Sequence, residues 1–230
     1  MKKVIILHGW TKALDKWQEF LKELEKKEVE YEFPKIPGLT ESLNKVWDLN
    51  DYIKWLQNIV DKEKDKVILI GHSNGGRIAL AFANLFPEKV EKLILIDSAG
   101  IYHNELPLRI KRFVFKTIAR VGKSLTSSKS LKDLLYEVAR ESDYKNLEGN
   151  VKQTMINLIS TDLKPILSQI TTPTLIIWGE NDKVTPFSDG LIMKGLIKNS
   201  KFYIVKEARH SPMFTHPTEV ANLIINNLAM

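Results

Sequence analysis

A glycine-flanked serine at residues 71–76, which read Gly-His-Ser-Asn-Gly-Gly, follows a short apolar run. The run at 67–70 is Val-Ile-Leu-Ile and predicts a buried strand. In the pattern Gly-x-Ser-x-Gly, a strand turns sharply into a helix, and the serine hydroxyl is raised above the sheet. The turn is so tight that residues two before and two after Ser73 must be small, as Gly71 and Gly75 are. The segment therefore predicts a nucleophile elbow.

Apolar runs and amphipathic stretches alternate along most of the chain. Strands are expected at 4–7, 29–33, 67–70, 93–96, 174–178 and 202–205. Helices are expected at 15–27, 49–61, 74–86, 187–197 and 218–228. Strands that are apolar throughout and separated by helices are typical of a parallel sheet covered on both faces. The pattern predicts an α/β fold with a doubly wound, mostly parallel sheet of about six strands.

The alternation stops between residues 101 and 165. Helical periodicity appears at 109–121, 131–138 and 151–160, and the glycine- and serine-rich segment 122–130 reads as a link. Residues 101–132 hold eight lysines or arginines and one acid, which gives this segment a net charge of +7. The whole chain has a net charge of +6, so the rest of it is close to neutral. The sequence thus predicts a core at 1–100 and 166–230 and a basic helical cap at 101–165. Such a charge run is most often a solvated helix face, but it could also meet anionic groups.

Composition limits the kind of site. The chain has no cysteine, which excludes disulfides, thiolate metal sites and a cysteine nucleophile. Its five histidines show no metal-ligand spacing, and no phosphate-binding glycine loop is present, so neither metal nor cofactor is expected. The apolar run at 4–7 is too short for a signal peptide, and no run reaches the length of a membrane span. A cytoplasmic location is expected.

A serine hydroxyl needs a base to remove its proton, and the base needs a third group to orient it. In this architecture the acid and then the histidine follow the serine, each after a later strand. Asp182 follows the strand at 174–178, and His210 follows the strand at 202–205. These two residues are the expected acid and base.

Two other acids compete with Asp182. Asp97 also follows a strand, at 93–96, and could reach the histidine from the neighbouring strand. Asp162 precedes its strand, so it is expected at the wrong end of the sheet, as a helix or loop cap. The choice between Asp97 and Asp182 stays open at this point.

An oxyanion formed at the serine needs two backbone N–H donors. One is expected from Asn74, directly after the nucleophile and at a helix N-terminus. The other is expected from Trp10, in the loop after the first strand, where Gly9 lets the backbone approach the site.

The segments HGW, GHSNGG, WGENDKVTP and ARHSPMFTHP, in this order, resemble the α/β-hydrolase fold superfamily over nearly the whole chain. The resemblance implies a nucleophile, acid and base at Ser73, Asp182 and His210, and a helical cap at 101–165. The strands that usually precede HGW are absent here, so the sheet is expected to be minimal. Asn74 replaces a more usual apolar residue, which keeps the N–H donor but makes that wall of the site polar.

The resemblance implies a serine carboxylesterase acting on small to medium esters. Serine at position 73 argues against the activities of the haloalkane dehalogenase and epoxide hydrolase relatives, which carry aspartate at the elbow. Alternatives are a carbon–carbon hydrolase of acidic ring-cleavage products, a hydrolase-like receptor for a small ligand, and an interfacial lipase. The expected partner is a small-molecule ester, and neither nucleic-acid binding nor stable membrane insertion is expected. The protein is expected to be a monomer or a homodimer.

Overall fold

The computed structural model describes residues 2–10, 14–103 and 149–228. Six parallel strands form one sheet in the order β2-β1-β3-β4-β5-β6. The strands are β1 (Val4–Leu7), β2 (Tyr31–Glu32), β3 (Val67–His72), β4 (Val90–Ile96), β5 (Thr174–Gly179) and β6 (Ser200–Val205). The sheet confirms the predicted parallel architecture and its number of strands.

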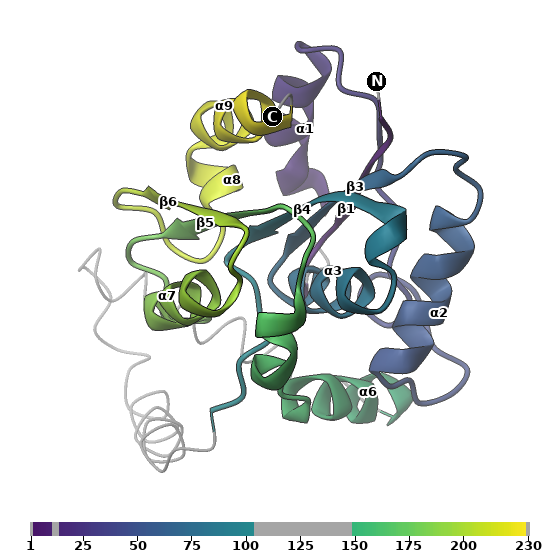
Figure 1. The fold of residues 1–230 in the computed structure, drawn as a ribbon. Helices are drawn as coiled ribbons and strands as arrows, with labels where there is room; N and C mark the ends of the chain where they lie inside the picture. The colour runs from purple at the N-terminus through teal and green to yellow at the C-terminus, as the bar shows by residue number, and fades with distance from the viewer. Residues whose placement is uncertain (1, 11–13, 104–148, 229–230) are drawn as a thin grey trace, which may run out of the picture.

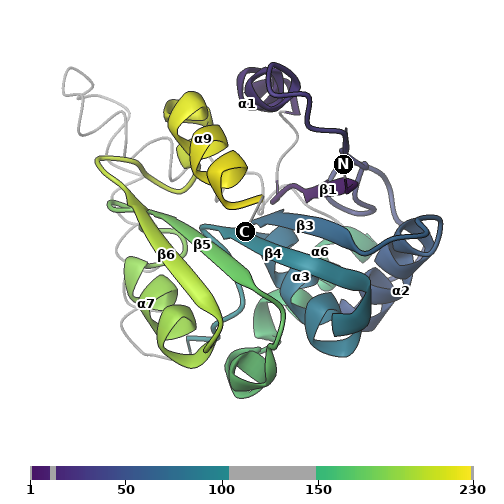
Figure 2. The same cartoon turned by 45° about the horizontal axis from the view of Figure 1, so that its top comes forward.

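Helices cover both faces of this sheet (Figures 1 and 2). On one face lie α1 (Gln18–Glu25) and α9 (Pro217–Leu228). On the other lie α2 (Leu49–Val60), α3 (Asn74–Leu85) and α7 (Phe187–Leu196). The shorter elements are η1 (Leu14–Trp17), η2 (Pro87–Lys89), α6 (Gly149–Ser160), η4 (Lys164–Gln169) and α8 (Pro212–Thr215). The doubly wound prediction is therefore confirmed.

Strand residues alternate between the two cores, because successive side chains of a strand point to opposite faces. In β1, Ile5 and Leu7 belong to the core beneath α2, α3 and α7, while Val4 and Ile6 belong to the core beneath α1 and α9. All four are buried, which explains why this strand reads as an unbroken apolar run. Packing in these two cores fixes the positions of the central strands. The loops that leave the carboxyl ends of these strands are positioned with them.

Two elements differ clearly from the sequence prediction, whereas β4 and β6 begin only a few residues earlier than predicted, at Val90 and Ser200. The strand expected at 29–33 is reduced to the two residues of β2, at the edge of the sheet, where Tyr31 and Glu32 are only half-buried. The helix expected at 15–27 is divided into the 3₁₀ turn η1 and the helix α1. Edge position and local turn geometry decide these bounds, and apolar periodicity detects neither.

Most of the predicted cap, residues 104–148, lies outside the described residues, and with it the helices expected at 109–121 and 131–138 and the link at 122–130. The third predicted helix corresponds to α6. Thr154 Oγ1 of α6 accepts the N–H of Trp47 at 2.8 Å, and Asn157 Nδ2 donates to the Trp47 carbonyl at 3.2 Å. Arg77 of α3 donates to the carbonyl of Thr161, just after α6. These bonds hold α6 and the residue after it against Trp47 and α3.

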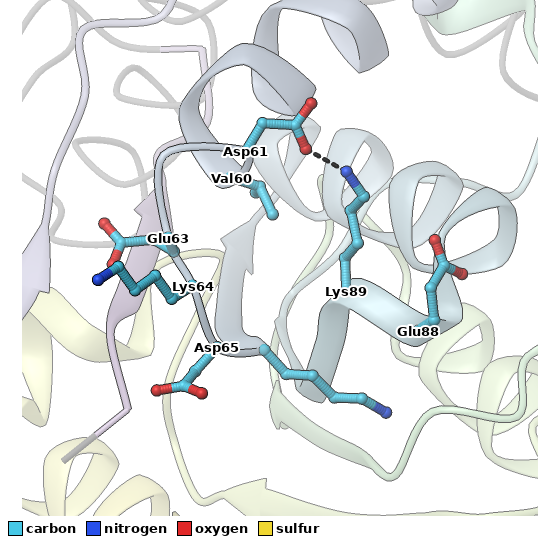
Figure 3. A pocket seen from close by; sticks show the side chains of 8 residues that line it. Val60, Asp61, Glu63, Lys64, Asp65, Glu88 and Lys89 are labelled. Carbon is cyan, nitrogen blue, oxygen red and sulfur yellow. Dashed lines mark hydrogen bonds and ion pairs between the residues drawn. The ribbon is translucent and has the colours of Figure 1, made fainter.

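A surface hollow of about 290 Å³ lies beside the starts of β3 and β4 (Figure 3). It is lined mainly by acidic residues and lysines, so charges of both signs face it, and Asp61 pairs with Lys89 across it. The amino ends of these strands lie opposite the edge that carries Ser73. Within the described part of the chain, no helix has both the length and the apolar character needed to cross a bilayer.

Candidate active site

Ser73 links β3 to α3 with φ 53° and ψ −120°, a conformation that side-chain-bearing residues rarely adopt. The turn is held by three backbone bonds to the Ser73 carbonyl, from the N–H groups of Gly76, Arg77 and Ala99. A Cβ on Gly71 would lie 2.5 Å from Gly76 Cα, and one on Gly75 would overlap the Leu7 carbonyl. The glycine requirement read from the sequence thus has a steric cause in the surrounding backbone.

Replacing Gly75 by alanine is expected to destabilise the fold by about 3 kcal/mol, because the added Cβ meets backbone that cannot move cheaply. Gly195→Ala in α7 is the matched control. Its Cβ would meet nothing within 4 Å, and the change should stabilise by about 0.5–1 kcal/mol through helix propensity. Urea unfolding of both variants checks the prediction, and equal effects would contradict it.

Three side chains that the sequence places far apart form one hydrogen-bonded chain. Ser73 Oγ lies 2.9 Å from His210 Nε2, and His210 Nδ1 lies 2.8 Å from Asp182 Oδ2. His210 and Asp182 are each only 5% exposed. A carboxylate accepts only, so Nδ1 must carry the proton that bonds to Asp182. That leaves Nε2 of the neutral ring free to accept a proton from Ser73.

The loops that carry Asp182 and His210 are packed directly against each other. Asn181 N–H donates to the Ala208 carbonyl at 2.8 Å, and a Cβ on Gly179 would lie 2.5 Å from the Arg209 carbonyl oxygen. Gly179 ends β5, so its missing side chain lets the second loop approach the end of the strand. This close approach brings the carboxylate and the imidazole together.

The carboxylate of Asp182 is fully engaged by its own loop and by His210. Oδ1 accepts the N–H groups of Val184 at 2.7 Å and Thr185 at 3.2 Å. Oδ2 accepts the Thr185 hydroxyl at 2.6 Å in addition to His210 Nδ1 at 2.8 Å. Four donors satisfy four lone-pair directions, which suits an ionised carboxylate in a buried place.

The two competing acids are bonded to backbone N–H groups. Asp97 ends up fully buried after β4, with φ 42°, and its Oδ1 accepts the N–H of Gly179 at 2.8 Å. Asp162 is exposed and accepts the N–H groups of Tyr102 and Lys164 at 3.1 Å each. Asp162 thus caps a loop, as its sequence position suggested, and Asp97 is bonded to the end of the neighbouring strand.

His72, directly before Ser73, supports the loop that carries His210. Its Nε2 lies 2.8 Å from the carbonyl oxygen of His210, so this nitrogen is the protonated one. The two rings pack with their centroids 5.0 Å apart. One donor atom each from His72, Asp97 and His210 lie within 4.8 Å of one another, a spacing that could suit a metal ion. Both His210 nitrogens are already bonded within the chain, however, so coordination would break the Ser73–His210–Asp182 arrangement.

The two expected oxyanion donors belong to segments that meet at Ser73. Asn74 begins α3, where the first N–H groups of a helix have no partner within the helix. Gly9 touches Ser73 so closely that a Cβ on it would lie 2.7 Å from Ser73 Cβ, and Trp10 follows it. Asn74 is 8% exposed, and its Nδ2 has no hydrogen-bond partner among the described residues. The wall beside Ser73 therefore carries a polar group.

Sequence reasoning missed two contacts. Thr185 bonds to Asp182 and lies 3.1 Å from His210 Nδ1, and its place three residues after Asp182 was a local signal for such a bond. His103 Nε2 lies 2.8 and 2.9 Å from the two carboxylate oxygens of Asp189 in α7. Burial raises the pKa of the Asp189 carboxyl, and the bond to His103 opposes that shift. No sequence pattern connects His103 to α7.

The chain matches a known protein family. A family model described as the alpha/beta hydrolase fold matches residues 2–217. The chain therefore belongs to the α/β-hydrolase fold family, and it is a hydrolase.

Two relatives carry the same name. The 2-hydroxy-6-oxononadienedioate/2-hydroxy-6-oxononatrienedioate hydrolase of Klebsiella pneumoniae is 30% identical over 205 residues, covering 79% of this chain and 68% of that protein. The hydrolase of that name from Escherichia coli K12 is 29% identical over 263 residues, covering 98% of this chain and 86% of that protein. A carbon–carbon hydrolase was one of the alternatives that the sequence left open.

Solved structures share the architecture. The alpha/beta hydrolase MGS-MChE2 from a lagoon-sediment metagenome is 26% identical, with a TM-score of 0.69 over 98% of this chain and 89% of that one. The thermophilic esterase of Thermogutta terrifontis is 21% identical, with a TM-score of 0.74 over 100% of this chain and 90% of that one. At that identity the esterase shows the fold alone.

Proposed function

We propose that this protein is a serine hydrolase that cleaves small to medium carboxylic esters through an acyl-enzyme on Ser73. The observation that carries the proposal is the 2.9 Å contact between Ser73 Oγ and His210 Nε2, with Nδ1 of the same ring 2.8 Å from Asp182. Such a chain makes the serine hydroxyl nucleophilic at neutral pH, because the histidine can take its proton as the bond to carbon forms.

In the proposed reaction, Ser73 Oγ attacks the acyl carbonyl carbon while its proton passes to His210 Nε2. The N–H groups of Trp10 and Asn74 stabilise the oxyanion, and Asp182 stabilises the imidazolium that has formed. Collapse of the tetrahedral intermediate breaks the bond to the alkoxy oxygen, which leaves with the proton from His210. Water then attacks the acyl-enzyme by the same route, releases the acid and restores the Ser73 hydroxyl.

A second candidate is hydrolysis of a carbon–carbon bond next to a ketone, and the names of the two relatives favour it. Ser73 would accept the acyl group in the same way, but the leaving group would be a carbon that must be protonated as it departs. The net charge of +7 on residues 101–132 suits a substrate that carries carboxylates.

Turnover of two substrate sets separates these candidates. We expect p-nitrophenyl acetate, butyrate and octanoate to be hydrolysed with kcat/KM at least 100-fold above that for a 2-hydroxy-6-oxo-dienoate. The reverse ratio would move the assignment to carbon–carbon hydrolysis. Saturable binding of either set with almost no turnover would instead indicate a ligand receptor.

A fluorophosphonate probe tests the nucleophile independently of the substrate. It should label the protein once, and mass spectrometry should locate the adduct on the peptide that contains Ser73. Labelling of another residue, or none, would contradict an acyl-enzyme on Ser73.

A further inference from the structure

We propose that Thr185 is a positioning residue that keeps His210 protonated on Nδ1 and aligned with Ser73. The proposal rests on the proposed function. It adds a fourth side chain to the hydrogen-bonded set of Ser73, His210 and Asp182. Thr185 would act through Asp182 and His210, and it would not touch the substrate.

The Thr185 hydroxyl lies at the junction of the acid and the histidine. Its oxygen is 2.6 Å from Asp182 Oδ2, 3.1 Å from His210 Nδ1 and 3.1 Å from the Asp97 carbonyl oxygen. The hydroxyl has one proton, and the ionised oxygen of Asp182 is both the nearest and the strongest acceptor. The Thr185 O–H therefore donates to Asp182, and a lone pair of its oxygen is left to accept from His210 Nδ1–H.

This proton arrangement selects one form of the imidazole. With the hydroxyl proton on Asp182, Nδ1 of His210 meets two acceptors, Asp182 Oδ2 and Thr185 Oγ1. A ring nitrogen without its proton would face only lone pairs there, which is unfavourable in a buried site. Both neighbours thus hold the proton on Nδ1 and leave Nε2 to accept from Ser73.

The position of Thr185 is itself fixed. Its N–H donates to Asp182 Oδ1 at 3.2 Å, and its carbonyl accepts the indole N–H of Trp178 at 3.1 Å. The residue is 8% exposed, so its side chain cannot turn into water. The backbone bonds survive a change of side chain, and valine has nearly the same shape. Thr185→Val therefore removes the hydroxyl bonds alone.

The titratable groups around His210 come from three strand ends. Asp182 follows β5, Asp97 follows β4, and His72 ends β3. In Thr185→Val, Asp182 loses its 2.6 Å donor and attracts the imidazolium proton more strongly. The acid limb of the pH–rate profile should then move to higher pH, while Asp97 and His72 are unchanged.

We expect Thr185→Val to lower kcat about tenfold, with KM within twofold of the wild-type value, on p-nitrophenyl butyrate. Thr185→Ser restores a hydroxyl at the same place and should return kcat to within about threefold and the acid limb to its original pH. A kcat within twofold of wild type in Thr185→Val overturns the proposal. A loss that serine does not rescue, with no shift of the acid limb, shows a merely structural role and also overturns it.

Thr172→Val is the matched control. Thr172 is 3% exposed before β5, at the opposite end of the strand from Asp182, and its Oγ1 has no hydrogen-bond partner within the described part of the chain. The same substitution there removes no bond and should leave kcat and the pH profile unchanged. If Thr185→Val does not fold, the ratio of kcat between Thr185→Ser and Thr185→Ala decides, and we expect about tenfold in favour of serine.

A spectroscopic measurement separates this proposal from the proposed function. The downfield proton resonance of His210 Nδ1–H, assigned by its loss in His210→Gln, should shift in Thr185→Val and return in Thr185→Ser. If Ser73→Ala kept its turnover, the proposed function would fail, and this resonance would still decide whether Thr185 holds the proton. An unchanged resonance in Thr185→Val refutes the proposal even when Ser73→Ala is inactive.

Discussion

Ser73→Ala is expected to lower kcat by roughly 10⁶, the scale at which removal of a serine nucleophile acts in a Ser-His-Asp hydrolase. Alanine has no oxygen to attack the acyl carbon, and His210 then has no proton to take. The fold should be unaffected, because the backbone bonds of Ser73 to Ile96, Gly76 and Ala99 do not involve the side chain. Steady-state turnover of p-nitrophenyl butyrate checks the rate, and circular dichroism checks the fold.

Ser73→Gly is the control that separates chemistry from strain. Glycine adopts φ 53° and ψ −120° more readily than alanine does, so Ser73→Gly should be about 1 kcal/mol more stable than Ser73→Ala. Both variants should be equally inactive. A Ser73→Ala protein with more than one per cent of wild-type turnover would contradict the proposed nucleophile, as would a glycine variant that kept activity.

The central strands were predictable because they are buried on both faces. An unbroken apolar run such as 67–70 has few alternatives once helical periodicity follows it, and β3 begins at the predicted residue, Val67. The same reasoning overstates β2, because only pairing with β1 keeps Tyr31 and Glu32 in the sheet. Apolar content reports burial, whereas the length of an edge strand depends on its partner.

The order of the loops could be predicted, but not the choice between two acids. Asp97 and Asp182 both follow a strand, and the sequence cannot say which carboxylate the histidine loop approaches. In the structure, the missing side chain of Gly179 lets the Arg209 carbonyl come close to the end of β5, which carries the loop of Asp182. Asp97 Oδ1 instead accepts the Gly179 N–H. These are contacts between separate loops, and they have no signature along the chain.

Thr185 and His72 escaped prediction for different reasons. Thr185 had a local signal, because a hydroxyl or carboxylate that bonds three residues away is common in turns, and Asp182 and Thr185 have that spacing. His72 could be placed beside the site from its position in the elbow. Its bond to the carbonyl of His210, 138 residues away, depends on the packing of β3 against the histidine loop.

Asp182→Asn is expected to lower kcat about 10⁴-fold, the scale seen when the acid of such a triad is replaced by its amide. The amide has one oxygen in place of two. The N–H groups of Val184 and Thr185 cannot turn away, so that oxygen will face them and the amide NH₂ will face His210. His210 Nδ1 must then accept, and its proton moves to Nε2, where it blocks proton transfer from Ser73.

Asp97→Asn is the matched control, because it changes the rival carboxylate in the same way. Its bond from the Gly179 N–H needs only one oxygen, which asparagine keeps, so we expect kcat within about tenfold of wild type. The two variants are compared on the same ester, with thermal unfolding to show that both are folded. A larger loss in Asp97→Asn than in Asp182→Asn would move the acid to the end of β4. The tautomer argument would then apply to Asp97, since whichever carboxylate holds Nδ1–H decides whether Nε2 can act as the base.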